Sequence, residues 1–385
     1  MGIPPHARFK RGPLLVSIFV VVLLYFLFYS SSISSSSSAH PSAAASKQAG
    51  KAAAALDLTR PEDTIELHSR ISRSLERYFP YDPTVQKTYP RTVWQTWKVG
   101  RNSDQFPTVF RRRADSWLEK NPGYAVELLD DNGAANFIRQ VYGAVPEVIE
   151  AYFAMPVPVL RADFLRYLFL LSRGGVYSDI DTVDLKPIDL WLPYIVTEPT
   201  ETTNSHSTIE MSDNDAVQLR AQIESQTGLA VGIEADPDRP DWHDWYARRL
   251  QFCQWTIMAK KGHPVLVDIV ANITAETLHR RATDKLPLPK AKNAGSMIMD
   301  WTGPGIWTDT VFKYLNRAIP GTDWHSITGI SKGKIIGDII IMPITAFSPA
   351  VGTMGAHDVG HPHAFSHHTF EGSWKPENER RINPS

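Results

Sequence analysis

The chain has 385 residues, enough for one large domain or two ordinary ones, and its hydrophobic fraction of 43% is typical of a globular protein. Its 40 basic and 41 acidic residues leave a net charge of −1, and no long basic run indicates nucleic-acid binding. The single cysteine, Cys253, excludes an intrachain disulfide, which taken alone favours a reducing compartment.

The N-terminus points to a different compartment. Residues 14–29 form a nearly unbroken apolar and aromatic run behind three basic residues, Arg8, Lys10 and Arg11. The run is shorter than the roughly 20 residues that cross a typical bilayer core, but thin membranes of the early secretory route accept shorter spans. The alternative is a cleaved signal peptide. The aromatic second half, and the lack of a clear small-x-small cleavage site, favour a transmembrane signal anchor.

The anchor divides the chain into a cytosolic tail, residues 1–13, and a lumenal remainder, because basic residues before a span hold the N-terminus in the cytosol. Residues 30–56 are rich in Ser and Ala and are predicted to form a flexible stem. Residues 57–385 are expected to form the lumenal domain. Its first helix, over residues 57–79, could extend the stem or offer an oligomerisation surface, since Leu67, Ile71 and Leu75 recur at helical spacing.

Strands and helices alternate in the next part of the chain. Residues 90–98 and 124–129 read as strands, and residues 110–120 and 133–142 read as helices. This order indicates an α/β protein with a parallel sheet covered by helices. In such sheets ligands bind beyond the carboxyl ends of the strands.

Residues 161–189 contain most of the candidate catalytic and metal-binding residues. The first half predicts a helix with Asp163, Arg166 and Tyr167 on one face. Gly174 and Gly175 are expected to end this helix, because glycine accepts the left-handed backbone of a helix C-terminus.

Residues 176–181 then predict a strand whose alternation points Asp179 and Asp181 to one side. Two close carboxylates disfavour each other's ionisation, and a divalent cation removes that cost. Hard cations such as Mn²⁺ and Mg²⁺ bind carboxylate oxygens and leave positions for phosphate oxygens. The alternative is a pair of aspartates that cap or solvate a loop. The preceding charged helix, the double glycine and the aromatic strand favour a metal–diphosphate site.

This block resembles the sugar-nucleotide-binding D-x-D region of glycosyltransferase family 32, in particular the fungal Golgi initiation-specific α-1,6-mannosyltransferases, and the similarity runs from about residue 90 to 375. The resemblance implies a GT-A-like nucleotide-binding fold with a mixed, largely parallel sheet flanked by helices, behind an N-terminal membrane anchor. It also implies a single-pass type II Golgi membrane protein that uses GDP-mannose with Mn²⁺ or Mg²⁺.

The segments that follow frame the predicted site. Residues 197–227 are crowded with polar residues and read as a partly disordered surface insertion, and residues 229–234 suit a buried strand. Residues 245–259 read as a helix whose Gln251 and Gln254 could bind sugar hydroxyls. Trp242 and Trp245 could supply flat faces for a sugar ring.

Two later segments add candidates. Gly303-Pro304-Gly305 reads as a tight turn into a helix beside the donor or acceptor pocket, with Asp309 as a polar contact or a helix N-terminal charge. The C-terminal segment holds five histidines, but their spacing does not suit structural zinc. There, either His367 or His368 could complete the metal shell.

The resemblance also implies residue roles. Asp181 would ligate the metal directly, and Asp179 would ligate it through water or contact the ribose. Arg166 would offset phosphate charge or hold Asp163, and Asp163 would bind the donor sugar. The nucleotide contacts would come from Trp97, Tyr167, Gly174, Gly175, Tyr177 and Trp374, with Ser373 beside the phosphates. Trp97 would stack on guanine, whereas Trp94 would belong to the core.

The implied reaction is retaining transfer of the first α-1,6-mannose to the N-glycan core of glycoproteins, which starts outer-chain elongation; no catalytic base is named. Three alternatives stay open. The chain could be an elongating subunit of a mannan polymerase complex, a transferase with a glycolipid acceptor, or a non-catalytic Golgi subunit that binds complex partners. The intact D-x-D context favours an enzyme.

Overall fold

The computed structural model describes residues 56–201, 207–288 and 294–372. The predicted tail, anchor and nearly all of the predicted stem, and Trp374 near the C-terminus, lie outside these ranges. The chain divides into residues 1–55 and residues 56–385, and the architecture below belongs to the second unit. No helix in the described ranges is long and apolar enough to cross a membrane.

The described residues form a seven-stranded central sheet in the order β2-β1-β3-β8-β7-β10-β9. Five strands run in one direction, and β8 and β9 run against them, so the expected mixed, largely parallel sheet is confirmed. The strands in sheet order are β2 (Ala125–Leu129), β1 (Thr92–Thr96), β3 (Gly175–Ser178), β8 (Gln251–Ala259), β7 (Leu229–Ala235), β10 (Ile339–Met342) and β9 (Lys334–Ile336).

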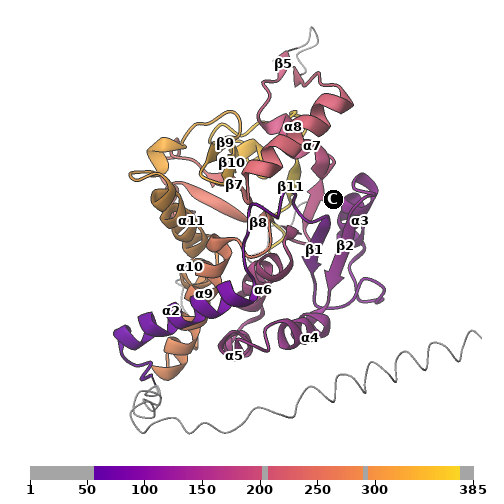
Figure 1. Ribbon diagram of the computed structural model, residues 1–385. Coiled ribbons are helices and arrows are strands. Elements are labelled where there is room, and N and C mark those ends of the chain that lie inside the picture. The colour runs from indigo at the N-terminus through magenta and orange to yellow at the C-terminus, as the bar shows by residue number, and fades with distance from the viewer. Residues whose placement is uncertain (1–55, 202–206, 289–293, 373–385) are drawn as a thin grey trace, which may run out of the picture. The chain divides into compact units, whose positions relative to one another are not determined.

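Helices cover both faces of the sheet. The larger core cluster lies under one set of helices, and Figure 1 shows α2, α9, α10 and α11 close together in this set. The set comprises α2 (Pro61–Tyr78), α4 (Asp131–Val141), α5 (Pro146–Ala154), α6 (Pro158–Arg173), α9 (Pro264–Ala282), α10 (Ala294–Trp301) and α11 (Pro304–Ala318). The smaller core cluster, on the other face, is covered by α3 (Thr108–Lys120), α7 (Ile188–Ile195) and α8 (Asp213–Gln226).

The junction between α6 and β3 explains the double glycine. Gly174 and Gly175 have φ angles of 68° and 100°, in the region that side chains disfavour. A Cβ on Gly175 would lie 2.4 Å from the carbonyl oxygen of Thr92, and one on Gly174 would lie 2.8 Å from that of Ala259. The two glycines therefore let the chain pass between β1 and β8, which is a structural requirement and separate from any nucleotide contact.

The helix predicted over residues 245–259 is wrong. A short 3-10 helix, η1 (Trp242–Asp244), is followed by β8, a central strand whose side chains are buried on both faces. A strand buried on both sides lacks the apolar–polar alternation that marks a half-exposed strand, so its sequence resembles that of a buried helix.

The polar segment 197–227 is more ordered than the sequence predicted. Ser212 caps α8 by accepting a hydrogen bond from the backbone N–H of Asp215, and Ile223 is buried. The helix packs on α7, and the short strands β5 (Thr200–Glu201) and β6 (Ser207–Thr208) pair before it. The expectation of a partly disordered insertion is therefore wrong for residues 213–226, while residues 202–206 lie outside the described ranges.

The predicted first helix is confirmed as α2. Its apolar side, formed by Leu67, Ile71 and Leu75, is buried, and the helix packs along α9. The apolar stripe is used inside the domain, so α2 belongs to the folded unit and not to the stem.

Candidate active site

The two aspartates of the D-x-D motif lie in a turn just after β3. The prediction that the strand continues to residue 181 is wrong, because β3 ends at Ser178 and a second short strand, β4 (Thr182–Asp184), begins immediately afterwards. The Thr182 hydroxyl donates to the carbonyl oxygen of Asp179 at 2.6 Å and closes the turn. The turn, and not strand alternation, brings the carboxylates of Asp179 and Asp181 together.

His368 completes a three-residue cluster with these aspartates. Strand β11 (Ser366–His368) pairs antiparallel with β4 and places His368 opposite Thr182. The Nε2 atom of His368 lies 3.1 Å from Oδ1 of Asp181, and the ring stacks on Trp255 with centroids 4.6 Å apart. Of the two histidines left open by the sequence, His368 is therefore the one that reaches the motif.

The charges of the cluster are mutually dependent. Burial raises the pKa of Asp179 and outweighs the opposing charge of Arg166. Burial also acts to raise the pKa of Asp181, but the charge and hydrogen bond of His368 overcome it and leave this pKa lowered. The same aspartate raises the pKa of His368 against the effect of burial. Arg166 thus balances charge on Asp179, and Asp181 favours the protonated form of His368 beside it.

The cluster has the donor set that Mn²⁺ accepts. One ligand atom from each of Asp179, Asp181 and His368 lies within 4.8 Å of the other two. The Nδ1 atom of His368 is buried without a hydrogen-bond partner among the described residues. Carboxylate oxygens and an imidazole nitrogen suit Mn²⁺, and the loss of the imidazole proton would accompany binding. The residues present therefore fit such an ion.

A buried hydrogen-bond network that begins on α6 holds the D-x-D motif in place. Arg166 reaches Oδ1 of Asp163 at 2.8 Å with one terminal nitrogen and Oδ1 of Asp179 at 3.1 Å with the other. The hydroxyl of Tyr177 donates to the same oxygen of Asp179 at 2.6 Å. Arg166 thus links the helix to the D-x-D turn, and Tyr177 fixes the rotamer of the first aspartate.

Asp163 also joins the motif to β8 and to the turn between α10 and α11. Its carboxylate accepts hydrogen bonds from Gln254 Nε2 at 3.2 Å and from the Thr302 hydroxyl at 3.0 Å. Burial raises the pKa of Asp163 to about 6, although Arg166 opposes the shift. The hydroxyl of Tyr167 donates to Oε1 of Gln254 at 2.7 Å, so both polar atoms of this amide are held.

Not every candidate lies in the open part of the site. Tyr167 is fully buried and stacks on Trp307, which places it behind Gln254. Trp94 is buried as expected and donates to the carbonyl oxygen of Gly174 at 2.9 Å. Trp97 is partly exposed and meets Phe110 edge to face at 4.6 Å.

Three other candidates are engaged elsewhere. Gln251 is buried, and its Oε1 accepts from the backbone N–H of Ala247 at 2.9 Å, so its amide is not free for a sugar. Trp245 is 58% exposed, and its Nε1 donates to Oδ2 of Asp241 at 3.1 Å. Asp309 forms a bidentate ion pair with Arg248. It therefore does more than place a negative charge near the start of α11.

The sequence reading missed two polar residues at this edge of the sheet. Glu234, near the end of β7, accepts from Gln251 Nε2 at 2.9 Å, and burial raises its pKa to about 7. Gln95, on β1, has its Oε1 atom buried without a hydrogen-bond partner in the described part of the chain. A signal existed for both, since each is a polar residue with a long side chain near the carboxyl end of a predicted strand, where ligands bind in such sheets.

Comparison with known proteins agrees with this geometry. Residues 107–197 match the family described as the glycosyltransferase sugar-binding region containing the DXD motif. The chain is 44% identical over 322 residues to the initiation-specific alpha-1,6-mannosyltransferase of Candida albicans, covering 80% of this chain and 77% of the relative. It is 36% identical over 411 residues to the protein of the same name from Saccharomyces cerevisiae, covering 82% and 83%. The solved structure of the PaToxG glycosyltransferase covers 68% of this chain and 79% of its own at 16% identity, and its TM-score of 0.33 is too low to carry an argument.

Proposed function

This chain belongs to the glycosyltransferase family of the yeast initiation-specific α-1,6-mannosyltransferases, and we propose that it transfers mannose from GDP-mannose to the N-glycan core in α-1,6 linkage. The observation that carries this proposal is the 44% identity to such a protein over 80% of the chain. The D-x-D turn, with its Arg166 and His368 partners, supplies the chemistry that such a transfer needs.

Asp179, Asp181 and His368 would hold Mn²⁺, with Mg²⁺ as the second choice. The bound ion would neutralise charge on the diphosphate leaving group. Arg166 and Tyr177 hold the Asp179 carboxylate in place, so the site is organised before the donor arrives. We also propose that the part of the sheet around the D-x-D turn binds the nucleotide as in a GT-A fold.

The donor sugar would meet the polar group formed by Asp163, Gln254 and Thr302. These residues come from α6, β8 and the turn between α10 and α11, and the hydrogen bonds among them hold their side chains in place before the donor sugar binds. Gln254 is the partly exposed member, so Asp163 acts mainly by orienting it. Tyr167 has the same orienting role from the core. Trp97 is the proposed stacking partner of guanine.

GDP-mannose is an α-donor and the proposed product is an α-linkage, so configuration is retained. We name no catalytic base, and departure of the leaving group is the main step that the site assists.

The proposal includes a type II topology in the Golgi membrane. A tail over residues 1–13, an anchor over 14–29 and a stem over 30–56 would place the domain at 57–385 in the lumen, next to glycoprotein acceptors. The apolar run and its basic flank in the sequence support this arrangement.

The deciding experiment offers the lumenal fragment from residue 57, with Mn²⁺ and GDP-mannose, an oligomannose N-glycan core beside a longer α-1,6-mannan oligosaccharide. Product linkage is read by mass and by an α-1,6-specific mannosidase. Transfer to the core supports the proposal. Transfer only to the longer oligosaccharide identifies an elongating enzyme, and transfer to neither contradicts both.

A further inference from the structure

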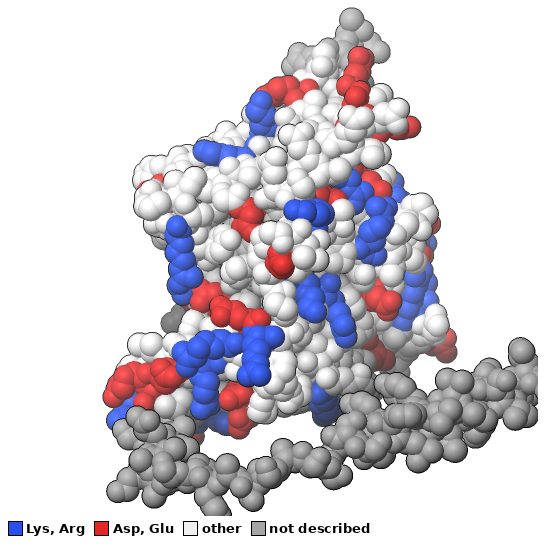
Figure 2. Space-filling view, in the orientation of Figure 1, with Lys and Arg blue, Asp and Glu red and all other residues white. Residues whose placement is uncertain are grey.

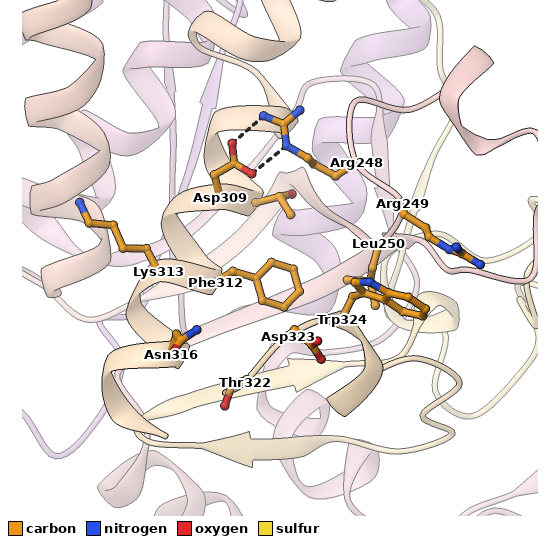
Figure 3. A pocket seen from close by; sticks show the side chains of 11 residues that line it. Arg248, Arg249, Leu250, Asp309, Phe312, Lys313, Asn316, Thr322, Asp323 and Trp324 are labelled. Carbon is orange, nitrogen blue, oxygen red and sulfur yellow. Dashed lines mark hydrogen bonds and ion pairs between the residues drawn. The ribbon is translucent and has the colours of Figure 1, made fainter. Parts of the chain in front are cut away.

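A groove of about 440 Å³ opens beside the start of β8, on the side covered by α11. Figure 3 shows Phe312 near its middle, the Arg248–Asp309 pair at one end and Asn316 with Thr322 at the other. Trp324 lies along one wall. The groove is thus lined by aromatic rings and by hydrogen-bonding groups in alternation.

The wall at the Arg248 end is rigid. Nε of Arg248 donates to Oδ1 of Asp309 at 2.7 Å, and a terminal nitrogen reaches Oδ1 of Asp300 at 3.0 Å. This arginine connects the loop before β8 with both α10 and α11. A planar guanidinium held by two carboxylates keeps its orientation, so this end of the groove is fixed before any ligand binds.

Arg249 is arranged differently from its neighbour. Its side chain is exposed, and its guanidinium lies 4.7 Å from the ring centroid of Trp324. No carboxylate within residues 56–201, 207–288 and 294–372 forms an ion pair with it. Arg249 therefore presents free N–H donors next to an aromatic ring.

The charges around the groove largely cancel. Arg248 is neutralised by its two aspartates, and Nζ of Lys313 lies 2.8 Å from Oδ2 of Asp268. A groove whose charges are paired except for that of Arg249, with ring faces and fixed polar groups, suits an uncharged, polyhydroxylated ligand better than a polyanion.

Two segments of the chain lead from the groove to the proposed donor-sugar contacts. Leu250 lines the groove, and Gln254, four residues further along β8, binds Asp163. Four residues of a strand span about 13 Å. Thr302, which also binds Asp163, lies in the turn between α10 and α11, two residues before the helix that carries Asp309 and Phe312.

We propose that this groove binds a distal part of an oligosaccharide acceptor, several sugar units from the hydroxyl that receives the mannose. The inference rests on the proposed function and extends it, because it names the surface that would favour a large glycan over a small one. Arg249 would bind vicinal hydroxyls, and the rings of Trp324 and Phe312 would contact sugar rings.

The test compares the full chain, purified in detergent, with its Arg249→Ala and Trp324→Ala variants. The matched control is Arg317→Ala, because Arg317 is an exposed arginine on α11 that does not line the groove. Each protein is assayed with a large oligomannose N-glycan core and with an α-linked dimannoside. For the core we expect KM to rise about tenfold in both groove variants, with kcat unchanged, because Arg249→Ala removes a charged hydrogen bond and Trp324→Ala removes an aromatic contact with a sugar ring. The dimannoside kinetics and the Arg317→Ala variant should match the wild type.

Binding without donor separates this inference from the proposed function. Saturation-transfer NMR should detect the oligomannose core on the wild type and on Arg317→Ala, but only weakly on Arg249→Ala. If the wild type transfers no mannose yet shows this binding pattern, the proposed function fails and the groove stands as a glycan site. Unchanged core kinetics in Arg249→Ala, or equal losses for both acceptors, would overturn the groove assignment.

Discussion

At the scale of single residues, the site is a set of buried charges that each have a defined partner. Asp179 is held by Arg166 and Tyr177, and Asp181 is held by His368. The partners keep two close carboxylates compatible in the absence of a cation. Both D-x-D aspartates and the α6 residues were predicted from sequence, because charged residues at helical spacing before a double glycine are conspicuous, and the structure brings them into one hydrogen-bonded network. The choice of His368 over His367 needed the pairing of β11 with β4.

Asp181→Asn tests the proposed metal site most directly. The amide keeps the size of the side chain but removes a charge that would bind the cation, so we expect transfer to fall by about three decades. Thermal unfolding of the purified variant should stay close to that of the wild type. A chelator should likewise abolish wild-type transfer, and added Mn²⁺ should restore it. Near-normal turnover of Asp181→Asn would contradict the assignment.

Asp184 offers a stability test outside the site. It is fully buried, Asn121 donates to its Oδ2 at 2.6 Å, and its Oδ1 has no partner among the described residues. Burial raises the pKa of Asp184 from 3.8 to about 8. Between these two pH values the folded state binds a proton that the unfolded state has lost, so stability falls as pH rises.

We therefore expect Asp184→Asn to be more stable than the wild type at pH 8, by about 1 kcal/mol or more. Its free energy of unfolding should also depend less on pH. Chemical denaturation at several pH values between 5 and 8 measures both effects. Asp358→Asn, at an exposed aspartate, is the control and should leave the slope as it is in the wild type. A steeper fall of stability with pH in Asp184→Asn than in the wild type would contradict the explanation.

At the scale of elements, the sequence predicted the helices and strands that have one buried and one exposed side. The apolar stripe of α2 and the capped start of α4, where Asp130 accepts from the N–H of Gly133, were both readable. β8 was missed because it is buried on both faces, and α8 was missed because few of its residues are buried. The groove beside the start of β8 could not be predicted either, since it joins segments near residues 249, 312 and 324 that only tertiary packing brings together.

The packing of α2 on α9 can be tested by two substitutions on the same helix. Leu75 is fully buried, whereas Ile65 is 67% exposed. Leu75→Ala should lower the free energy of unfolding by about 3 kcal/mol, because it leaves a cavity under the helix. Ile65→Ala should change it by less than about 0.5 kcal/mol. Urea denaturation gives both values. Equal effects would contradict a docked α2, and a change in oligomeric state with Ile65→Ala would revive its role as an oligomerisation surface.

At the scale of the whole molecule, two features of composition point in different directions. Figure 2 shows basic and acidic side chains interspersed over the face in view, in keeping with a net charge of −1. The N-terminal apolar run predicts a lumenal domain, but a chain with one cysteine cannot use the oxidising lumen to form an intrachain disulfide. A reactive free thiol there would risk pairing with other proteins.

The burial of Cys253 reconciles these features and makes a testable claim. Its side chain is fully buried in β8, and burial raises the pKa of the thiol well above its usual range, so little reactive thiolate forms. We expect the native protein to resist a thiol-specific reagent, and the denatured protein to take up one equivalent. Adding a reductant should leave the thermal unfolding temperature unchanged, because no disulfide contributes to the fold. Rapid labelling of the native protein, or a shift of that temperature with reductant, would show that the thiol is accessible and would remove the physical reason for expecting this domain to tolerate an oxidising compartment.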